Sequence, residues 1–385
     1  MGLGRPLHSG STSATAMEGP NRLRLLLVTA SLLVGGMLTG SAEQITTPLP
    51  NRPNIPLGLD AYMPIPEDNP LTPEKVALGK KLFNDRILSR DRSISCATCH
   101  NPRRTFTDGR PVSVGVFGRK GPRNVPALVN RGYGKAFFWD GRAASLEEQA
   151  LQPIENPNEF GHSVSEVIAR LNSHPEYPPQ FRVAFGWEVN AADLARALAS
   201  YVRTILSGDA PADRFFAGDR DVFSPEARRG LDVFRGKGNC TACHIGPTFS
   251  DEQFHNTGVA WRPEVSGLLD AGRFAVSGKE TDRGAFKTPT LRHVAETAPY
   301  MHDGSLVTLE EVVEFYNRGG RPNPHLDGEI RPLGLIGEEK HALIAFLKSL
   351  SGTIQEGIPR ASPAPTLGRT CRSAPTVNRR GAYEK

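Results

Sequence analysis

Residues 96–100 read Cys-Ala-Thr-Cys-His, and residues 240–244 read Cys-Thr-Ala-Cys-His. A cysteine pair at this spacing can form thioether bonds with the two vinyl groups of one haem, and the adjacent histidine is then held as the proximal iron ligand. Half a zinc site or a redox dithiol would also explain a single Cys-x-x-Cys. The histidine in both copies, and the lack of a further cysteine pair, favour haem. The sequence therefore predicts two covalently bound c-type haems, held by Cys96, Cys99, His100, Cys240, Cys243 and His244.

The chain around these two motifs repeats one plan. In each copy a glycine and a phenylalanine precede the cysteines, and a proline, a phenylalanine and an aspartate follow the histidine. The two sets are Gly79, Phe83, Pro102, Phe106 and Asp108, and Gly230, Phe234, Pro247, Phe249 and Asp251. A short amphipathic helix that leads into a haem-binding loop is how a c-type cytochrome domain begins. We therefore expect a mainly α fold with two cytochrome c-like domains, each carrying one haem.

Apolar spacing and capping signals set the expected domain boundaries. The pattern predicts helices over 192–206 and 337–350, and further helices that begin after Ser224 and at the capping box of Thr308. We expect an N-terminal domain over 66–215 and a C-terminal domain over 216–352. A Pro-rich extended arm over 43–65 precedes them. Residues 353–385, which contain the fifth cysteine, Cys371, have no periodicity and are predicted to be a disordered tail.

The first 42 residues resemble an export signal. Arg22 and Arg24 precede an apolar run over 25–38, and Gly-Ser-Ala follows at 40–42. This order is typical of a signal peptide with a cleavage site of small residues, which predicts a periplasmic protein. An uncleaved membrane anchor is the alternative for this segment. No later stretch is long and apolar enough to span a bilayer.

The charge distribution argues against a nucleic-acid partner. The formal net charge of the whole chain is +5. Most of it comes from the first 42 residues and from the tail, and residues 43–352 are close to neutral. Binding to nucleic acid depends on a basic patch or stripe, which this core lacks.

A chain with two haems is either an electron carrier or an enzyme, and the ligands opposite the proximal histidines separate the two classes. A carrier fills both sixth positions with strong protein ligands, whereas an enzyme leaves one iron open for substrate. Binding of carbon monoxide or cyanide to the first haem, at residues 96–100, would tell them apart.

Several further motifs resemble those of the bacterial di-haem cytochrome c peroxidase family, and more closely those of its MauG-like branch. The resemblance covers roughly residues 66–352. Its motifs are 121–126 (Gly-Pro-Arg-Asn-Val-Pro), 138–142 (Phe-Trp-Asp-Gly-Arg), 146–150 (Leu-Glu-Glu-Gln-Ala), 156–159 (Asn-Pro-Asn-Glu), 288–292 (Thr-Pro-Thr-Leu-Arg) and 297–304 (Thr-Ala-Pro-Tyr-Met-His-Asp-Gly).

The resemblance implies that the first haem is open. Family members that need reductive activation carry a second histidine just before the Gly-Pro-Arg-Asn stretch, and here the matching residue is Val116. Valine cannot bind iron. No other histidine lies between His100 and Trp139. We therefore expect the first haem to be ready for peroxide without a change of ligand, unless a loop from elsewhere in the chain supplies one.

For the second haem, at residues 240–244, the resemblance implies a tyrosine ligand. Peroxidases of the family place a methionine fourteen residues after the histidine of the Pro-Tyr-x-His motif, and the matching residue here is Tyr316. Proteins of the MauG-like branch are similar in having tyrosine there. Met301 and His302 are the rival ligands. A phenolate stabilises oxidised iron, whereas methionine raises the potential.

The resemblance also assigns the residues around the haems. Glu159 is implied as the acid–base group for peroxide cleavage, with Gln149 as a polar neighbour. Trp139 is implied to lie between the haems and to couple them. Cleavage of peroxide needs a proton to move between its two oxygens, so a carboxylate near the open iron is also a chemical requirement.

A calcium ion between the two domains is implied in the same way. Asn124 would supply its side-chain oxygen, and Thr297 and Pro299 would supply backbone carbonyls. These are the hard oxygen ligands that calcium prefers, although waters would have to complete the shell.

Three hypotheses follow for the function. The leading one is a periplasmic di-haem peroxidase that reduces hydrogen peroxide with electrons from a small cytochrome c or cupredoxin. The second is a MauG-like enzyme that uses oxidised haems to oxidise side chains of a partner protein. The third, of another class, is a non-catalytic di-haem electron carrier. A homodimer is compatible with all three.

Overall fold

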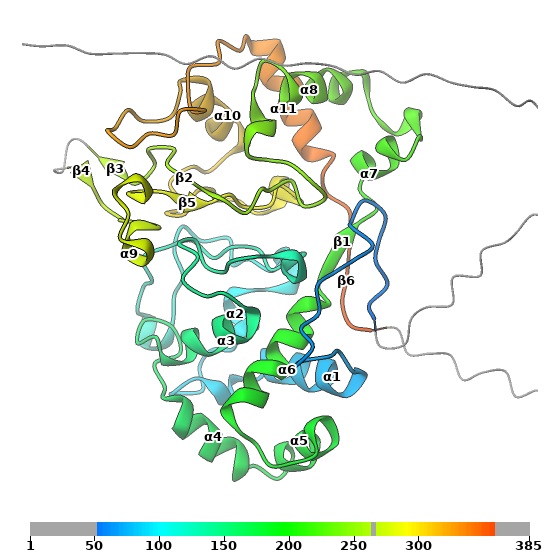
Figure 1. Cartoon of the computed structure of the whole chain (residues 1–385), viewed down its shortest axis with the longest axis vertical. Helices are drawn as coiled ribbons and strands as arrows, with labels where there is room; N and C mark the ends of the chain where they lie inside the picture. The colour runs from blue at the N-terminus through cyan, green and yellow to red at the C-terminus, as the bar shows by residue number, and fades with distance from the viewer. Residues whose placement is uncertain (1–51, 263–266, 359–385) are drawn as a thin grey trace, which may run out of the picture. The chain divides into compact units, whose positions relative to one another are not determined.

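The computed structural model describes residues 52–262 and 267–358, so the predicted signal peptide, residues 43–51 of the arm and Cys371 lie outside the described residues. The fold is rich in helices, as predicted (Figure 1). None of the described helices is long and apolar enough to cross a membrane. The helices are α1 (Pro73–Asn84), α2 (Cys96–Cys99), α3 (Leu146–Glu155), α4 (Val164–Asn172), α5 (Tyr177–Phe185), α6 (Ala191–Arg203), α7 (Pro211–Phe216), α8 (Pro225–Arg235), α9 (Phe274–Ser277), α10 (Leu309–Asn317) and α11 (Gly337–Lys348).

The strands are short and pair two by two. Each of the three sheets is antiparallel and has two strands. The pairs are β1 (Leu206–Gly208) with β6 (Thr353–Gln355), β2 (Phe254–His255) with β5 (Phe286–Lys287), and β3 (Trp261–Arg262) with β4 (Gly267–Leu268). Sheets of this size cannot form a core by themselves. The core is therefore formed by helices that pack against one another.

The sequence repeat corresponds to two helix crossings of the same kind. Helix α1 packs on α6, and α8 packs on α11. A Cβ atom on Gly79 would lie 1.9 Å from the carbonyl oxygen of Ala197, and one on Gly230 would lie 1.9 Å from that of Ala342. Only glycine permits so close an approach of two backbones. In both copies, the helix that precedes the haem motif therefore crosses its partner helix at an equivalent position.

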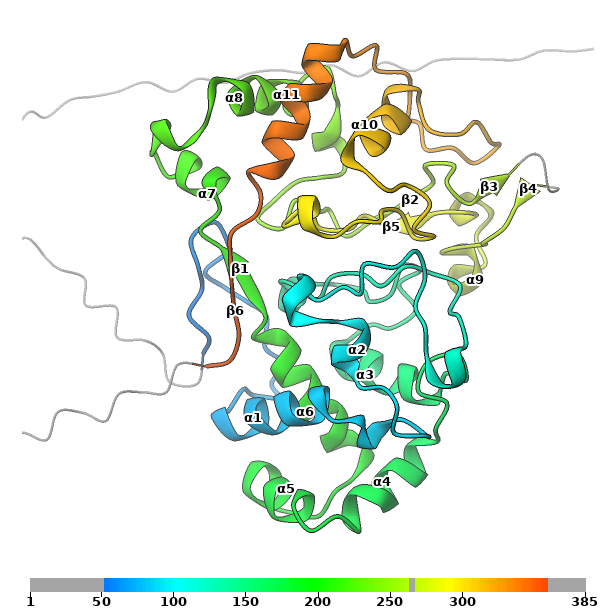
Figure 2. The same cartoon turned by 180° about the vertical axis from the view of Figure 1, so that it is seen from behind.

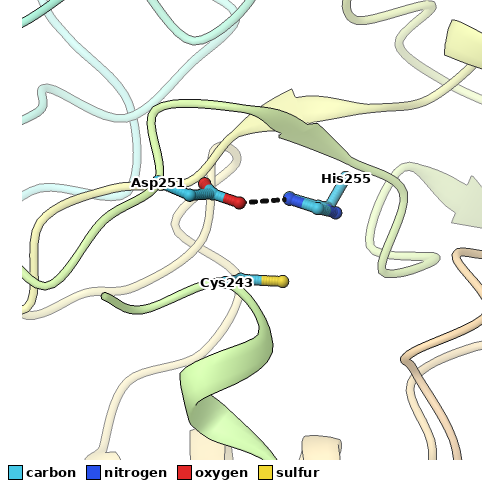
Figure 3. Close-up of side chains that lie close together, drawn as sticks. All are labelled: Cys243, Asp251 and His255. Atoms are coloured by element: carbon cyan, nitrogen blue, oxygen red, sulfur yellow. Dashed lines mark hydrogen bonds and ion pairs between the residues drawn. The ribbon is translucent and has the colours of Figure 1, made fainter. Parts of the chain in front are cut away.

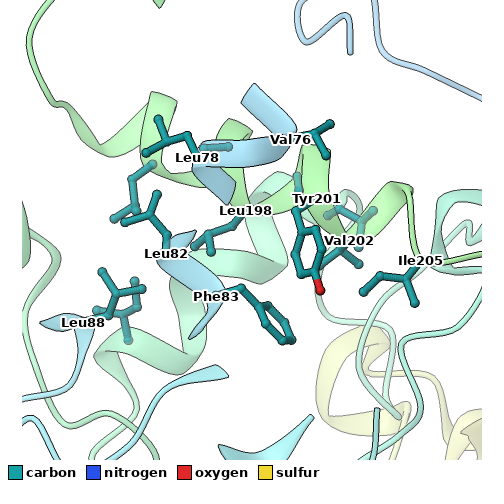
Figure 4. Packing of buried hydrophobic residues seen from close by; sticks show 14 of the residues in the cluster. Val76, Leu78, Leu82, Phe83, Leu88, Leu198, Tyr201, Val202 and Ile205 are labelled. Carbon is teal, nitrogen blue, oxygen red and sulfur yellow. The ribbon is translucent and has the colours of Figure 1, made fainter. Parts of the chain in front are cut away.

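Aromatic packing also repeats between the two crossings. The ring of Phe83 lies 5.1 Å from that of Tyr201, and the ring of Phe234 lies 4.9 Å from that of Phe346. Figure 4 shows Phe83 and Tyr201 among the buried residues between α1 and α6. Apolar side chains at a spacing of three or four along each helix form these contacts.

Two clusters of buried apolar residues surround the crossings. The first includes Leu82, Phe83, Leu198 and Tyr201, and the second includes Leu231, Phe234, Leu343 and Phe346.

We call residues 66–215 the N-terminal half and residues 216–352 the C-terminal half. The described residues from 52 onward belong to one compact unit. The division into two domains at residue 216 therefore stays a prediction.

The prediction placed the start of the disordered tail too early in the sequence, at residue 353. Residues 353–355 form β6, and Leu206 of β1 pairs with Gln355 while Gly208 pairs with Thr353. The two strands lie side by side in both views (Figure 1, Figure 2). Strand β1 lies about 150 residues earlier, and so distant a partner leaves no periodic signal within so short a segment. The correction concerns this stretch only, since residues 359–385 lie outside the described residues.

Residues 52–65 of the predicted arm contain no helix or strand. They are nevertheless bound to the helical core. The Tyr133 hydroxyl donates to the carbonyl of Asp60 at 2.6 Å, and the Arg292 guanidinium donates to that of Gly58 at 2.8 Å. Met63 is buried in the first apolar cluster.

Candidate haem site

The first haem motif forms a short turn that orients its histidine. Cys96 and Cys99 are the ends of α2, and the backbone N–H of His100 donates to the Cys96 carbonyl at 2.8 Å. The Nδ1 atom of His100 lies 3.1 Å from the carbonyl oxygen of Phe106. Burial lowers the pKa of His100 to about 4. A neutral imidazole that is held by a carbonyl at Nδ1 is typical of a histidine that binds metal through its other nitrogen.

The second motif repeats this geometry. The backbone N–H of His244 donates to the Cys240 carbonyl at 2.9 Å, and its Nδ1 lies 2.9 Å from the carbonyl oxygen of Phe249. Burial lowers the pKa of this histidine as well. Phe106 and Phe249 occupy matching places in the sequence repeat, and both have a positive φ, 58° and 51°. The repeat therefore turns the two carbonyls toward the two histidines in the same way.

The four cysteines of the motifs are free thiols. Burial raises the pKa of Cys96 and Cys240 to about 12 and that of Cys99 to about 11. Buried neutral thiols are poor metal ligands, because a thiolate is the form that binds metal. None of the four is in a disulfide, so each sulfur is available for a thioether bond.

One continuous cavity of about 860 Å³ reaches both motifs. It lies near the upper end of the volumes of ligand pockets, about 300–1,000 Å³. Its lining includes all six motif residues together with many apolar side chains. The volume, the apolar walls and the two histidines fit two haems.

Glu159, Gln149 and Trp139 line the same cavity as His100, and their roles stay a prediction. The amide of Asn156 donates to Glu159 Oε1 at 2.7 Å. Burial nevertheless raises the pKa of Glu159. A half-buried carboxyl group that faces a cavity is suited to hold a proton.

Val116, at the place of the expected missing ligand, is fully buried. Its backbone N–H donates to the carbonyl of Glu159 at 2.8 Å. A Cβ atom on the preceding residue, Gly115, would lie 2.2 Å from the carbonyl oxygen of Asn158. The loop around Val116 therefore packs closely against the backbone of Glu159 and supports its position.

Trp139 connects the two halves through its hydrogen bonds. Its indole Nε1–H donates to the carbonyl of Asn124 at 2.9 Å, and its own carbonyl accepts from the backbone N–H of Lys287 in β5 at 2.8 Å. Trp139 belongs to the N-terminal half and Lys287 to the C-terminal half. This placement is consistent with a side chain between two haems.

All three candidates for the sixth ligand of the second haem line the cavity. Burial, and then the nearby Cys243 and Cys240, raise the pKa of Tyr316. His302 instead stacks on Phe286, with ring centres 3.7 Å apart. Tyr316 therefore lies near the second cysteine pair, and the choice among the three ligands stays a prediction.

The residues of the predicted calcium site, Asn124, Thr297 and Pro299, also line the cavity. The backbone N–H of Asn124 donates to the carbonyl of His302 at 2.7 Å, and its side-chain amide donates to that of Arg110 at 2.8 Å. The two halves therefore meet at Asn124. A cation at this site stays a prediction.

The sequence analysis did not single out His255, which lies beside the second haem motif. The ring lies 3.0 Å from Asp251, and Cys243 is close by (Figure 3). On its other side the ring lies 2.6 Å from Asp327. The neighbouring Cys243 side chain and the carboxylates of Asp327 and Asp251 raise the pKa of His255, against the effect of burial. The sequence held no signal for this residue, because the first motif has no histidine at the matching distance from Asp108.

Cys243, Asp251 and His255 have ligand atoms within 4.8 Å of one another, which would suit a metal ion. The Cys243 sulfur is, however, the predicted thioether atom of the second haem. A sulfur bonded to haem carbon is no longer a thiolate, so we assign this cluster to the haem site.

Comparison with known proteins agrees with this site. A family model described as di-haem cytochrome c peroxidase matches residues 73–221. The methylamine utilization protein MauG of Methylorubrum extorquens is 45% identical over 290 residues, which cover 75% of this chain and 81% of that protein. Cytochrome c551 peroxidase of Pseudomonas aeruginosa is 37% identical over 303 residues, which cover 76% of this chain and 84% of that protein.

Among solved structures, a MauG-like protein associated with microbial copper homeostasis is similar to this chain, with a TM-score of 0.69 and 34% identity. The match covers 76% of this chain and 95% of that one. The resemblance therefore extends to most of the fold, well beyond the two haem motifs.

Proposed function

The chain belongs to the di-haem cytochrome c peroxidase family and is an oxidoreductase enzyme, and on that premise we propose that it is a periplasmic peroxidase that reduces hydrogen peroxide to water. Two haem c groups would be bound through Cys96, Cys99, Cys240 and Cys243 and ligated by the adjacent histidines. The relatives named as enzymes leave the non-catalytic electron carrier without support.

The observation that carries the proposal is the placement of Glu159. Its carboxyl group lines the same cavity as His100, and burial raises its pKa. When bound, the first haem supplies the iron at which peroxide is reduced. Glu159 would accept a proton from the incoming peroxide and deliver it to the departing oxygen, which is the transfer that the reaction needs. Gln149 would orient peroxide or water by hydrogen bonding.

The second haem would take Tyr316 as its sixth ligand and pass electrons through the region of Trp139. The nearness of Tyr316 to the second cysteine pair and the bridging hydrogen bonds of Trp139 support these roles. Electrons would come from a small cytochrome c or a cupredoxin. A calcium ion held by Asn124, Thr297 and Pro299 is part of the same proposal.

A second candidate function is the oxidation of side chains on a partner protein, as in the MauG-like branch. It is favoured by the identity of 45% to a protein named MauG and by tyrosine, a ligand that stabilises oxidised iron, at position 316. Both candidates use the same open first haem. They differ in whether the reductant is a small redox protein or the partner to be modified.

The test begins with the fully oxidised, haem-loaded protein, to which hydrogen peroxide and a reduced small cytochrome c are added. Rapid oxidation of the cytochrome without prior reduction would support the peroxidase. A long-lived change in the enzyme's own spectrum with little turnover would favour the MauG-like function. Absence of any spectral response would reject both.

A further inference from the structure

Lys287 is a buried basic residue in the cavity for which the proposed function has no use. It ends β5, is 8% exposed and lines the cavity that reaches both haem motifs. Its backbone is fixed by the hydrogen bond to the carbonyl of Trp139. Lysine is rarely buried without a partner for its charge.

The nearest carboxylate, Glu252, is already bound by another cation. Arg131 donates to both of its oxygens, at 2.7 and 3.0 Å, and the backbone N–H of Lys135 donates to one of them at 3.2 Å. The ammonium of Lys287 lies 3.6 Å from Glu252, which is too long for a hydrogen bond. Lys287 therefore shares Glu252 with Arg131, and the second carboxylate that attracts it, Asp251, is already bound to His255.

The other described basic side chains that line the cavity are satisfied in a different way. Arg331 is exposed, so water solvates its charge. The remaining arginines each bind carboxylates at 3.0 Å or less. These pairs are Arg123 with Asp140 and Asp270, Arg142 with Asp140, and Arg292 with Asp213. Lys287 differs from these arginines, because its ammonium group has no carboxylate oxygen closer than 3.6 Å.

A buried ammonium group without a hydrogen-bond acceptor is costly unless an anion joins it. Burial, and then repulsion by Arg131, lower the pKa of Lys287 to about 7. A haem attached through its vinyl groups keeps its two propionate carboxylates. The cavity would receive these anions together with the haems.

We propose that the ammonium group of Lys287 binds a haem propionate in this cavity. Lys287 is then a positioning residue, which fixes the haem plane between the two halves. Its positive charge also raises the midpoint potential of that haem, because a cation close by favours the reduced iron, which carries one positive charge less. The inference rests on the proposed haem attachment but not on peroxide turnover.

The test compares Lys287→Met with Lys279→Met in the haem-loaded protein. Both changes remove one lysine charge from the C-terminal half, but Lys279 is exposed, so water and salt screen its charge. The midpoint potentials of both haems are measured by spectroelectrochemistry, and the propionate bending bands by resonance Raman spectroscopy. We expect Lys287→Met to lower the potential of one haem and to shift its propionate band, and Lys279→Met to change neither.

The conservative variant Lys287→Arg should restore the potential and keep a shifted but ordered propionate band, because it retains the charge. If Lys287→Met does not retain both haems, Lys287→Gln takes its place, since it removes the charge and keeps a donor. Unchanged potentials and bands in the neutral variant would overturn the proposal. A loss of peroxide turnover with unchanged potentials and bands overturns it too, and leaves the peroxidase proposal to the Glu159 test.

Discussion

Replacing Gly230 with alanine tests the helix crossing that positions the second haem motif. The new Cβ would lie 1.9 Å from the carbonyl oxygen of Ala342 and 2.8 Å from the Cβ of Phe346, whereas real Cβ contacts stay beyond 3.0 Å. The closest atom belongs to the backbone of α11 and cannot rotate away. Helices α8 and α11 would have to separate.

The cost can be estimated from these distances. Overpacking typically costs about 1–3 kcal/mol, and the backbone clash places this site at the upper end. Alanine has a higher helix propensity than glycine, and this offsets the loss in unfolding free energy by about 1 kcal/mol. The expected net loss in unfolding free energy is therefore about 2 kcal/mol. Separation of the helices would also loosen the contact of Phe234 with Phe346.

Urea unfolding followed by helical circular dichroism measures the change, and Gly337→Ala is the matched control. Gly337 begins α11, and no other atom lies within 4 Å of a Cβ placed there. We expect no loss of stability in this control. Gly79→Ala should mirror Gly230→Ala, with the spectrum of the first haem disturbed in place of the second. Equal stability of Gly230→Ala and the unchanged protein would refute the close crossing.

Three further predictions concern single side chains. Glu159→Gln should slow peroxide-dependent cytochrome oxidation by about 10²-fold or more with both haem spectra retained; an unchanged rate in stopped-flow measurements removes Glu159 from the mechanism. Tyr316→Phe should alter the low-spin spectrum of the second haem alone, and an unchanged spectrum would pass the ligand role to Met301 or His302. Although burial by itself raises the pKa of Glu252, Arg131 outweighs it and holds this pKa at about 2, below the ordinary 4.5. This depressed pKa contributes about 3 kcal/mol of stability above pH 4.5, which is lost as pH falls toward 2. The difference in unfolding free energy between wild type and Glu252→Gln should therefore shrink between pH 7 and pH 3, and a constant difference would contradict the assignment.

Local features of the fold were predictable because their signals lie close together in the sequence. The hydroxyl of Thr308 caps α10 as the capping box predicted, and Ser224 caps α8. The repeat predicted a helix before each haem motif, and α1 and α8 are those helices. The helix predicted over 192–206 is also present, although it ends at Arg203.

The end of that helix illustrates the limit of periodicity. Ile205 and Leu206 continue the apolar spacing and are fully buried, but Leu206 begins β1. Its partner β6 lies far away in the sequence, so burial alone could not tell a helix from a strand here. The contacts of Lys287 and His255 were hidden for the same reason. Lys287 depends on Glu252, and His255 on Asp327 as well as on the nearby Asp251, so each has a carboxylate from a distant segment.

Helix crossings within each half and polar contacts between the halves have different roles at the site. Each haem motif depends on a helix pair within its own half, and the halves meet through polar groups on loops and short strands, such as Trp139 with Lys287 and Arg123 with Asp270. Because the helix crossings are separate, a change at one of them should disturb mainly one haem. A change at the polar contacts should alter the exchange of electrons between haems while each stays attached. The proposed peroxidase would take electrons at one haem and use them at the other, and this division would keep the two haems at a fixed separation during transfer.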